Sequence, residues 1–313
     1  MSDAVRIVDL SYCYRHQWTG SRICSLHPFS LSITEGEVFG FLGHNGAGKT
    51  TTIKNILRLI TPSTGSIEIF GCDNRDPKSR QPIGYVPEHP YFYDYLRVNE
   101  AIRMGAELAG LPRREIKSRV SETIERVGLS ARSSAPLRTL SKGLVQRVAI
   151  AQALVAYPRL LILDEPFSGL DPLGRREMCG LFDQERRRGT TIFMASHILS
   201  DVEYLCDRVS IMAGGELKGV FSLADIPRQS QSGAHLVIES PRESDAAWEQ
   251  FRCSRHRQGA LLDLSFSEEE HARNALQECL RLGYRVCSFE VAHGNLENLY
   301  LSLVDTKMAR EER

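Results

Sequence analysis

The sequence predicts an α/β fold built on a mostly parallel sheet, and three observations support this prediction. Short apolar runs alternate with longer amphipathic segments from Val5 to Phe221, which is typical of helices that cover a parallel sheet. A glycine-rich loop follows one of these runs, and two adjacent carboxylates end another. The runs with the length and branching of buried strands are Val38–Leu42, Leu160–Leu163, Thr191–Ala195 and Val209–Met212.

A helical subdomain interrupts this pattern over residues 89–157. Three amphipathic patterns follow one another there without an intervening strand, and they predict helices at Asn99–Ala109, Arg113–Val127 and Leu144–Tyr157. Gly214 and Gly215 then predict a turn between two late strands. We therefore expect a first domain over residues 1–226 with the helical subdomain inserted in it.

A small α+β domain is expected over residues 234–304, after a polar, turn-rich linker at Pro227–Gly233. The expected order of its elements is β-α-β-β-α-β, which would make it ferredoxin-like. Asp305–Arg313 reads as a frayed, charged end. The expected strands are His235–Glu239, Cys253–Arg257, Ala260–Phe266 and Tyr284–Val291, and the expected helices are Ser244–Phe251 and Glu268–Leu282.

Composition excludes several classes of protein. The chain has 313 residues, of which 42% are hydrophobic, and 39 basic residues balance 39 acidic ones, so no nucleic-acid partner is expected. No apolar stretch reaches the roughly 20 residues of a membrane span, and the N-terminus lacks the pattern of a signal peptide. The eight cysteines form no CxxC pair, so we read them as reduced thiols.

The segment Gly43–Thr50 fits the phosphate-loop pattern and lies between an apolar run and a predicted helix at Thr51–Ile60. Glycines in such a loop let backbone N–H groups converge on phosphate oxygens, while Lys49 adds positive charge and Thr50 offers an oxygen to Mg²⁺. The alternative is a glycine-rich turn that matches by chance, and the flanking strand and helix argue against it.

Two adjacent carboxylates, Asp164 and Glu165, follow four apolar residues. A buried strand would deliver both to its C-terminal edge, where Asp164 can hold Mg²⁺ and Glu165 can polarise an attacking water as general base. On its own this pattern also fits a strand that merely ends in solvated acids.

A third motif, Leu140–Arg147, precedes the acidic pair by one short helix, and with it the sequence resembles the ABC ATPases. The resemblance covers about two thirds of the chain and implies their fold, in which an N-terminal antiparallel β part accompanies the parallel core. It also implies that Ser141 and Gly143 approach a γ-phosphate bound by a second subunit. Lys142 and Leu144 depart from the commonest form of this signature.

Further positions match the family in order. Ser168–Asp171 resembles the loop that crosses the dimer interface, His197 resembles the catalytic switch histidine, and Tyr14 matches the aromatic that stacks on adenine, with Tyr12 as an alternative. Glu88 replaces the usual glutamine and still offers oxygens to Mg²⁺. The resemblance thus implies that ATP is bound by Tyr14, Gly43, His44, Asn45, Gly46, Ala47, Gly48, Lys49, Thr50, Thr51, Ser141 and Gly143, and Mg²⁺ by Thr50, Glu88 and Asp164.

The resemblance points to the exporter branch whose cargo is sodium, a drug or a polysaccharide-related compound, with separate transmembrane permease subunits and a second ATPase subunit as partners. It implies a peripheral protein on the cytoplasmic face of the membrane. The aromatic run Tyr91–Leu96 is a candidate groove for a permease helix, or else part of the core. The alternatives are a soluble ABC ATPase that remodels nucleic-acid or ribosomal complexes, and a regulatory module without turnover.

Overall fold

The structure is a computed structural model that describes residues 2–15, 21–226, 233–239, 248, 251, 253–266, 268–292 and 296–304. The chain divides into two compact units, residues 1–221 and 222–313. This division falls slightly earlier than the boundary expected after residue 226.

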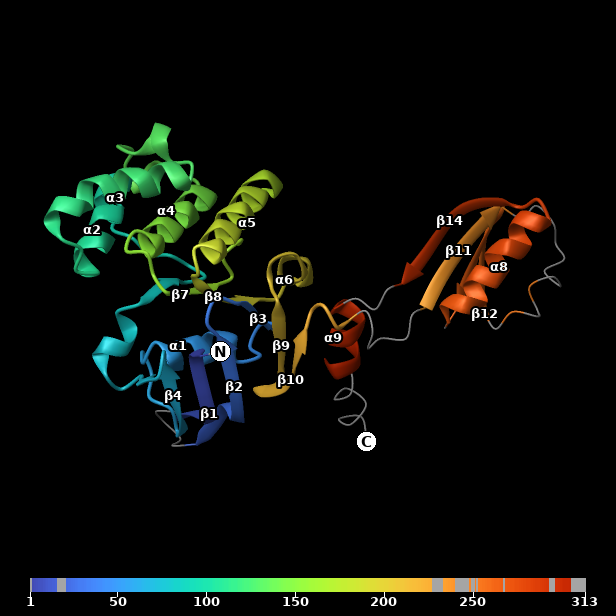
Figure 1. The fold of residues 1–313 in the computed structure, drawn as a ribbon, viewed down its shortest axis with the longest axis horizontal. Helices are drawn as coiled ribbons and strands as arrows, with labels where there is room; N and C mark the ends of the chain where they lie inside the picture. Colours follow the sequence, from blue (N-terminus) through green and yellow to red (C-terminus); the bar gives the residue numbers. More distant parts are fainter. Residues whose placement is uncertain are drawn as a thin grey trace. The chain divides into compact units, whose positions relative to one another are not determined.

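A six-stranded sheet with the order β10-β9-β3-β8-β7-β6 forms the centre of the first unit (Figure 1). The strand pairs β3–β8, β3–β9, β7–β8 and β6–β7 are all parallel, which confirms the expected core. All residues of β3, β7 and β8 are buried, which explains their continuous apolar sequences. The strands are β3 Val38–Leu42, β6 Ile83–Val86, β7 Leu160–Asp164, β8 Thr191–Ser196, β9 Arg208–Ala213 and β10 Glu216–Ser222.

A second, antiparallel sheet with the order β2-β1-β4-β5 confirms the expected N-terminal β part. Its inward side chains, such as Ile7, Leu31 and Ile67, share one core with Phe41 and Phe193 of the parallel sheet. Burial alternates along the second half of β2, as expected for a strand with one face in the core. The strands are β1 Asp3–Arg15, β2 Arg22–Thr34, β4 Thr64–Ile69 and β5 Cys72–Asp73.

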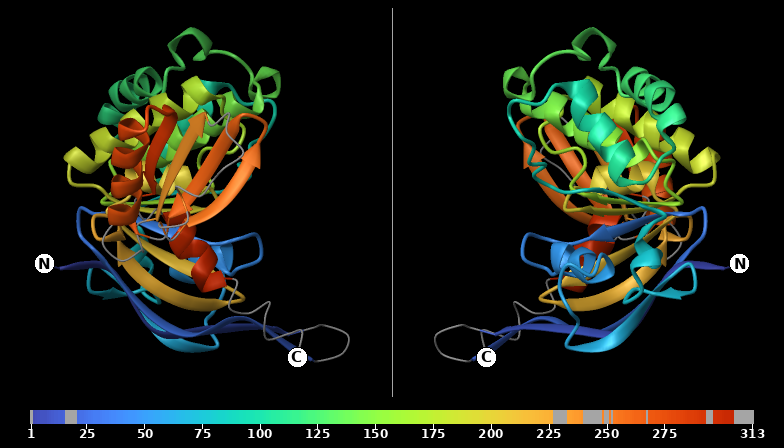
Figure 2. Two further views of the ribbon diagram at one scale, coloured as in Figure 1. Left: turned by 90° about the vertical axis from the view of Figure 1, so that its right-hand side faces the viewer. Right: turned by 90° about the vertical axis from the view of Figure 1, so that its left-hand side faces the viewer.

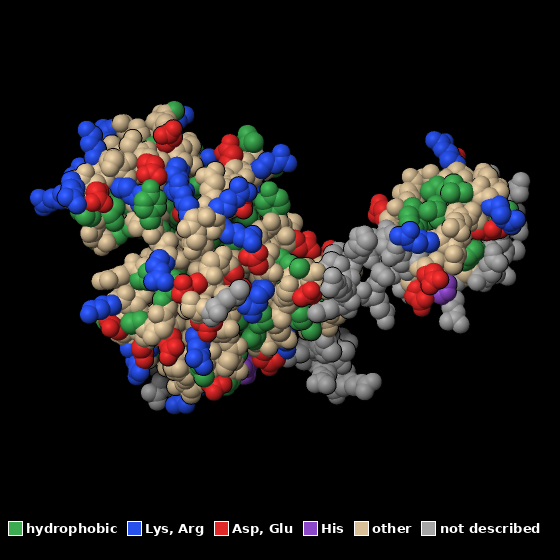
Figure 3. Space-filling view, viewed as in Figure 1, with side chains coloured by type: hydrophobic (Ala, Val, Ile, Leu, Met, Phe, Trp, Pro, Cys, Tyr) green, Lys and Arg blue, Asp and Glu red, His purple; other side chains and the backbone are tan. Residues whose placement is uncertain are grey.

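Three helices, α2, α3 and α4, form the expected helical part. They lie at the opposite end of the first unit from β1, β2 and β4 in Figures 1 and 2, and Lys and Arg side chains are spread over them in Figure 3. Among the described residues no helix is both long and apolar enough to cross a membrane. The helices of the unit are α1 Lys49–Ile56, α2 Val98–Leu108, α3 Arg113–Arg126, α4 Lys142–Leu154, α5 Pro172–Arg187 and α6 Leu199–Leu205, with 3₁₀ turns η1 Pro77–Arg80, η2 Ser130–Arg132 and η3 Leu137–Thr139.

The second unit contains a sheet with the order β12-β13-β11-β14, in which the neighbouring strands are antiparallel. Its core includes Leu236, Leu264 and Trp248 beside Ala275 of α8. The positions of the four predicted strands are confirmed, whereas most of the helix expected at Ser244–Phe251, the linker and the tail lie outside the described residues. The elements are β11 Gly233–Glu239, β12 Cys253–Gln258, β13 Leu261–Phe266, α8 Glu269–Arg281, β14 Arg285–Ala292 and α9 Leu296–Val304.

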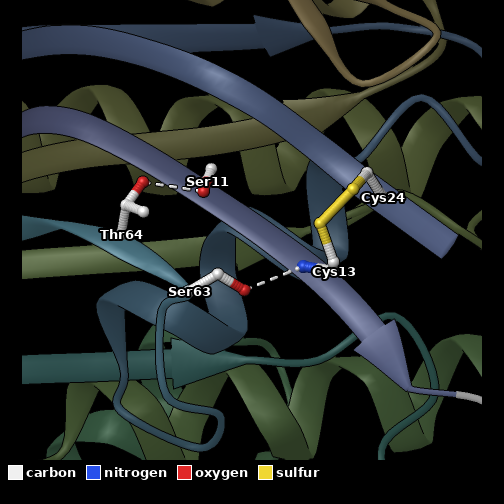
Figure 4. The surroundings of a disulfide bond; sticks show 5 residues. All are labelled: Ser11, Cys13, Cys24, Ser63 and Thr64. Atoms are coloured by element: carbon white, nitrogen blue, oxygen red, sulfur yellow. Dashed lines mark hydrogen bonds between the residues drawn. A yellow bond between two sulfur atoms is a disulfide. The ribbon is translucent and has the colours of Figure 1, made fainter. Parts of the chain in front are cut away.

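The reading of all eight cysteines as reduced thiols is wrong for one pair, because Cys13 of β1 and Cys24 of β2 form a disulfide (Figure 4). These residues are direct cross-strand partners with their Cα atoms 3.8 Å apart. Their separation of 11 residues in the sequence does not reveal this register. The free cysteines are Cys72, Cys179, Cys206, Cys253, Cys279 and Cys287.

Candidate functional site

The phosphate loop follows β3 and leads into α1, as the sequence predicts. Gly46 and Gly48 adopt φ angles of 83° and 108°, in the left-handed region that favours glycine. A Cβ atom on Gly43 would lie 2.6 Å from the carbonyl oxygen of Met212, so the loop passes directly against β9. Gly48 is the N-cap of α1 and offers no capping side chain, which leaves N–H groups of the first turn available to an anion.

Lys49 and Thr50 begin α1 and point toward the end of β7. The buried Lys49 Nζ donates hydrogen bonds to the carbonyl oxygens of Gly43 at 2.6 Å and His44 at 3.3 Å. The same nitrogen lies 3.3 Å from Glu165 Oε1. Thr50 Oγ1 donates to Asp164 Oδ2 at 2.9 Å. The loop and the acidic pair therefore form one connected site.

Asp164 ends β7 with a buried side chain whose Oδ1 has no hydrogen-bond partner. Burial, together with the nearby Glu165 and Glu88 carboxylates, raises the pKa of this carboxyl to about 6 against the lowering effects of the Thr50 hydrogen bond and the Lys49 charge. A cation beside the unpaired oxygen would favour the charged form.

The residues present fit Mg²⁺ held jointly by protein and phosphate. Mg²⁺ prefers oxygen ligands and usually uses one or two carboxylates together with substrate phosphates. Asp164, Thr50 and Glu88 all line the same pocket and supply such oxygens. Within the described part of the chain no group of three or more His, Cys, Asp and Glu side chains could hold a metal alone. A site shared between protein and phosphate does not require such a group of side chains.

Glu165 lies one residue beyond the end of β7 in a strained backbone conformation, with φ of 50°. Its N–H donates to the carbonyl oxygen of Ala195 at 3.0 Å, which ties this conformation to the neighbouring strand β8. Oε2 of Glu165 lies 2.9 Å from Nδ1 of His197, just after β8. Strained residues of this type are concentrated at functional sites, and this arrangement fits a carboxylate base beside a histidine.

These side chains meet because β3, β8 and β7 are neighbours in the parallel sheet, and each functional segment follows the carboxyl end of one strand. The segments surround a pocket of about 300 Å³. Most of the predicted phosphate and metal ligands line it, and His197 is adjacent through Glu165. The lining residues are Ser25, His44, Asn45, Gly46, Gly48, Lys49, Thr50, Thr51, Glu88, Asp164 and Glu165.

Ser25 is a pocket residue that the sequence reasoning missed. Its hydroxyl oxygen lies 3.2 Å from Thr51 Oγ1, which also lies 3.5 Å from the hydroxyl of Tyr14. Tyr14 is 43% exposed, whereas Tyr12 packs against the core and meets the Tyr14 ring edge-on. Of the two candidate aromatics, Tyr14 therefore has the more accessible ring beside the pocket.

The signature motif lies outside this pocket. Ser141 is the N-cap of α4 and its hydroxyl accepts a hydrogen bond from Leu144 N at 3.4 Å. A Cβ atom on Gly143 would lie 2.8 Å from the carbonyl oxygen of Gly169, so the motif packs tightly against the loop after Glu165. Neither Ser141 nor Gly143 is among the residues described as lining the pocket. One copy of the chain therefore does not bring the predicted ligands together into one site.

This fold and site define a nucleotide-binding protein of the phosphate-loop class. Comparison with known proteins narrows the class: residues 26–168 match the model of the ABC transporter family. The bacitracin transport ATP-binding protein of Bacillus licheniformis is 32% identical over 97% of this chain and 98% of its own length. The chain thus belongs to the ABC transporter family, as an ATP-binding subunit that hydrolyses ATP.

Two further similarities extend this result. An uncharacterized ABC transporter ATP-binding protein of Nostoc sp. is 36% identical over 95% of this chain and 88% of its own length, so the similarity includes the second unit. A solved structure of an ATP-binding subunit of an ABC transporter has a TM-score of 0.65 and 34% identity, and the match covers 72% of this chain and 92% of that one.

Proposed function

We propose that this chain hydrolyses ATP at the interface of two ATPase subunits to drive export through separate transmembrane permeases. The observation that carries this proposal is the position of the signature. The phosphate loop and acidic pair line the pocket, whereas Ser141 lies at the start of another helix outside it. A second copy, or a close relative, would supply the missing half of the site.

In this proposal each ATP molecule is contacted by both subunits. The backbone of the phosphate loop and Lys49 bind the phosphates of one nucleotide, and the helix N-terminus at Ser141 of the partner subunit approaches its γ-phosphate. Glu165 accepts the proton of the attacking water, and His197 holds the Glu165 carboxylate in place. Asp164, Thr50 and Glu88 would hold Mg²⁺, which would neutralise charge at the phosphates when bound.

The aromatic run Tyr91–Leu96 is the proposed permease-docking surface. Tyr91, Tyr93 and Tyr95 are 93%, 59% and 73% exposed, and the rings of Tyr93 and Tyr95 stack with centroids 5.6 Å apart. Large exposed aromatic clusters commonly mark interfaces. The exposure favours the docking interpretation of the run over a purely structural one.

Replacement of Tyr93 and Tyr95 by alanine tests this surface. We expect the double variant to keep the ATPase activity of the purified chain and to lose its co-purification with a membrane protein. Leu59→Ala removes an exposed apolar side chain from a different segment and serves as the control. If the tyrosine variant still co-purifies with the membrane protein at the wild-type level, the run Tyr91–Leu96 is excluded as a docking site.

We further propose an antimicrobial peptide or a similar drug as the cargo. The support is the similarity to a bacitracin transport protein over nearly the whole chain. In this role the protein would be peripheral, on the cytoplasmic face of the membrane. Residues 234–304 would form an accessory domain of that subunit.

Co-expression with the membrane protein that co-purifies with the chain tests the function as a whole. Cells with both proteins should tolerate more of a cyclic peptide antibiotic than cells with a Lys49→Ala variant of the chain. Equal tolerance to all peptide antibiotics would exclude the proposed cargo. Absence of any membrane protein in extracts that retain ATPase activity would favour a soluble remodelling ATPase instead.

A further inference from the structure

A disulfide joins the two strand segments that carry Tyr14 and Ser25 to the edge of the nucleotide pocket. Cys13 immediately precedes Tyr14 in β1, and Cys24 immediately precedes Ser25 in β2. Tyr14 and Ser25 both approach Thr51 Oγ1, and Ser25 and Thr51 line the pocket. The covalent bond is thus one residue away from two side chains that border the nucleotide site.

A change in strand register explains why Ser25 faces the pocket. Tyr12 pairs with Leu26, but the next residue of β1, Cys13, pairs with Cys24, so Ser25 is an extra residue in β2. An extra residue of this kind forms a bulge, which redirects a side chain and twists the strand locally. The disulfide fixes the register immediately beyond the bulge.

Beyond the bulge, the two strands are not held equally by the rest of the structure. On β1, the N–H of Cys13 donates to Ser63 Oγ at 3.1 Å, and Ser11 Oγ lies 2.7 Å from Thr64 Oγ1 (Figure 4). These contacts attach β1 to the segment that leads into β4. β2 is the edge strand of the sheet β2-β1-β4-β5, and its sheet neighbour at the Cys24 end is β1. On the other side of the bulge, the N–H of His27 donates to the carbonyl oxygen of Gly215 at 2.8 Å, so only the segment from Cys24 to the start of β2 depends on β1.

Both cysteines of the disulfide are at least partly accessible to solvent. Cys24 is exposed and Cys13 is half-buried, whereas Cys179, Cys206 and Cys279 are buried. Burial raises the pKa of the Cys179 thiol to about 11 and that of the Cys279 thiol to about 12, which makes these groups unreactive. Disulfides in a reducing compartment are usually transient, and exposed ones are the more easily reduced.

We propose that Cys13 and Cys24 form a reversible redox modification site that controls nucleotide affinity through the position of Ser25 and Tyr14. Oxidation forms the S–S bond between Cys13 and Cys24 and breaks the S–S bond of a small-molecule disulfide such as glutathione disulfide. The two sulfurs of that disulfide take up the two electrons and the two thiol protons and become two thiols. The oxidised form holds β2 against β1 and keeps both hydroxyls at Thr51. In the reduced form the Cys24 end of β2 is released. Nucleotide binding must then order this edge of the pocket, and the free-energy cost of that ordering lowers the affinity.

The test compares MgADP binding by the full chain in oxidised and reduced glutathione, with calorimetry as the measurement. Trapping of free thiols followed by intact-mass analysis establishes the state of the pair in each buffer. We expect the oxidised protein to bind at least about threefold more tightly, because the bulge is ordered in advance. MgADP is used because hydrolysis does not complicate its binding.

Two variants make the test specific. The double variant Cys13→Ser, Cys24→Ser should bind like the reduced protein in both buffers, and Cys24→Ser alone serves if the double variant does not fold. Cys287→Ser removes an exposed free thiol of the second unit and should leave the redox response intact. The inference is wrong if the pair stays reduced in glutathione disulfide, if wild-type affinity is equal in both buffers, or if the double variant still responds.

This inference rests on nucleotide binding at the proposed pocket, and the experiment separates the two claims. Binding that is equal in both buffers would overturn the redox site and leave the proposed function standing. Complete lack of MgADP binding in both buffers would overturn both.

Discussion

Nδ1 of His197 lies 2.9 Å from Oε2 of Glu165, and Lys49 Nζ lies 3.3 Å from the other oxygen of the same carboxylate. The carboxylate is thus held between a cation of the phosphate loop and a histidine that follows the neighbouring strand. The positive φ of Glu165 directs it into this position. Each carboxylate oxygen of Glu165 thus has one partner, Lys49 or His197. Small changes at this residue should therefore affect ATP hydrolysis more than ATP binding.

Glu165→Gln should reduce ATP turnover by at least about 100-fold, because an amide cannot accept the proton of the attacking water. ATP binding should persist, since the phosphate loop and Lys49 are unchanged, and the unhydrolysed nucleotide should hold two subunits together. Steady-state phosphate release and light scattering with ATP measure the two effects. Near-normal turnover would refute Glu165 as the base, and Glu68→Gln, an exposed site on β4, provides the matched control.

Asp164 should make the stability of the nucleotide-free chain depend on pH. Its folded pKa of about 6 lies above its ordinary value of 3.8, so between these values the folded state holds a proton that unfolding releases. The contribution is fully present below pH 3.8 and is lost as the pH rises through 6. It changes by up to about 1.4 kcal/mol per pH unit within this window.

Thermal unfolding with a metal chelator, at several pH values between these limits, measures this effect in wild type and in Asp164→Asn. The variant carries no titratable group at this position, so its stability should fall less as the pH rises from 4.5 toward 6.5. Parallel curves for the two proteins would show that Asp164 does not titrate in this range.

The main features of the core and the pocket could be predicted because they depend on local sequence. The apolar strands, the glycine-rich loop and the acids at a strand end each appear within a few consecutive residues. Parallel strands then place the loop, Asp164, Glu165 and His197 at one edge of the sheet. The helix of the signature motif begins at Lys142, two residues before the predicted start at Leu144, because the capping role of Ser141 depends on its own backbone conformation.

Features that depend on strand register were not predictable in the same way. Ser25 faces the pocket only because β2 contains one extra residue opposite β1, and no pattern around it indicates a bulge. The same register brings Cys13 and Cys24 together. Cysteines that form no compact motif do not show in the sequence which of them pair. The pairing becomes visible only when the register of the two strands is known.

Gly143→Ala should impair ATP-dependent dimerisation and leave ADP binding by a single subunit intact. The new Cβ would lie 2.8 Å from the carbonyl oxygen of Gly169, so the signature or the following loop must shift. Such overpacking costs about 1–3 kcal/mol. Light scattering at increasing ATP concentration, together with ADP calorimetry, measures both properties.

Gly180→Ala is the matched control, because a Cβ atom there would meet nothing within 4 Å. It lies within α5 and should raise stability by about 0.5–1 kcal/mol through better helix propensity. Dimerisation of Gly143→Ala at wild-type ATP concentrations would mean that this packing does not position the signature.

Asp201 should act as a positioning residue for His197, through an ion pair with Arg175 that joins helices α5 and α6. Its buried carboxylate lies 3.2 Å from Nη1 of Arg175, and its other oxygen has no hydrogen-bond partner. Arg175 belongs to α5, which follows Ser168–Asp171, while Asp201 belongs to α6, which follows His197. The pair therefore fixes the spacing between the two segments that flank Glu165.

Asp201→Asn should lower the turnover number about tenfold with little change in KM for ATP, because it disturbs His197 and not the phosphate loop. Stability should fall by about 2 kcal/mol, since Arg175 loses its buried partner. Asp201→Glu should restore part of the turnover by keeping the charge, and Asp183→Asn, in an exposed pair with Arg187, should change neither property. A loss of stability with unchanged turnover well below the melting temperature would show that the pair is only structural.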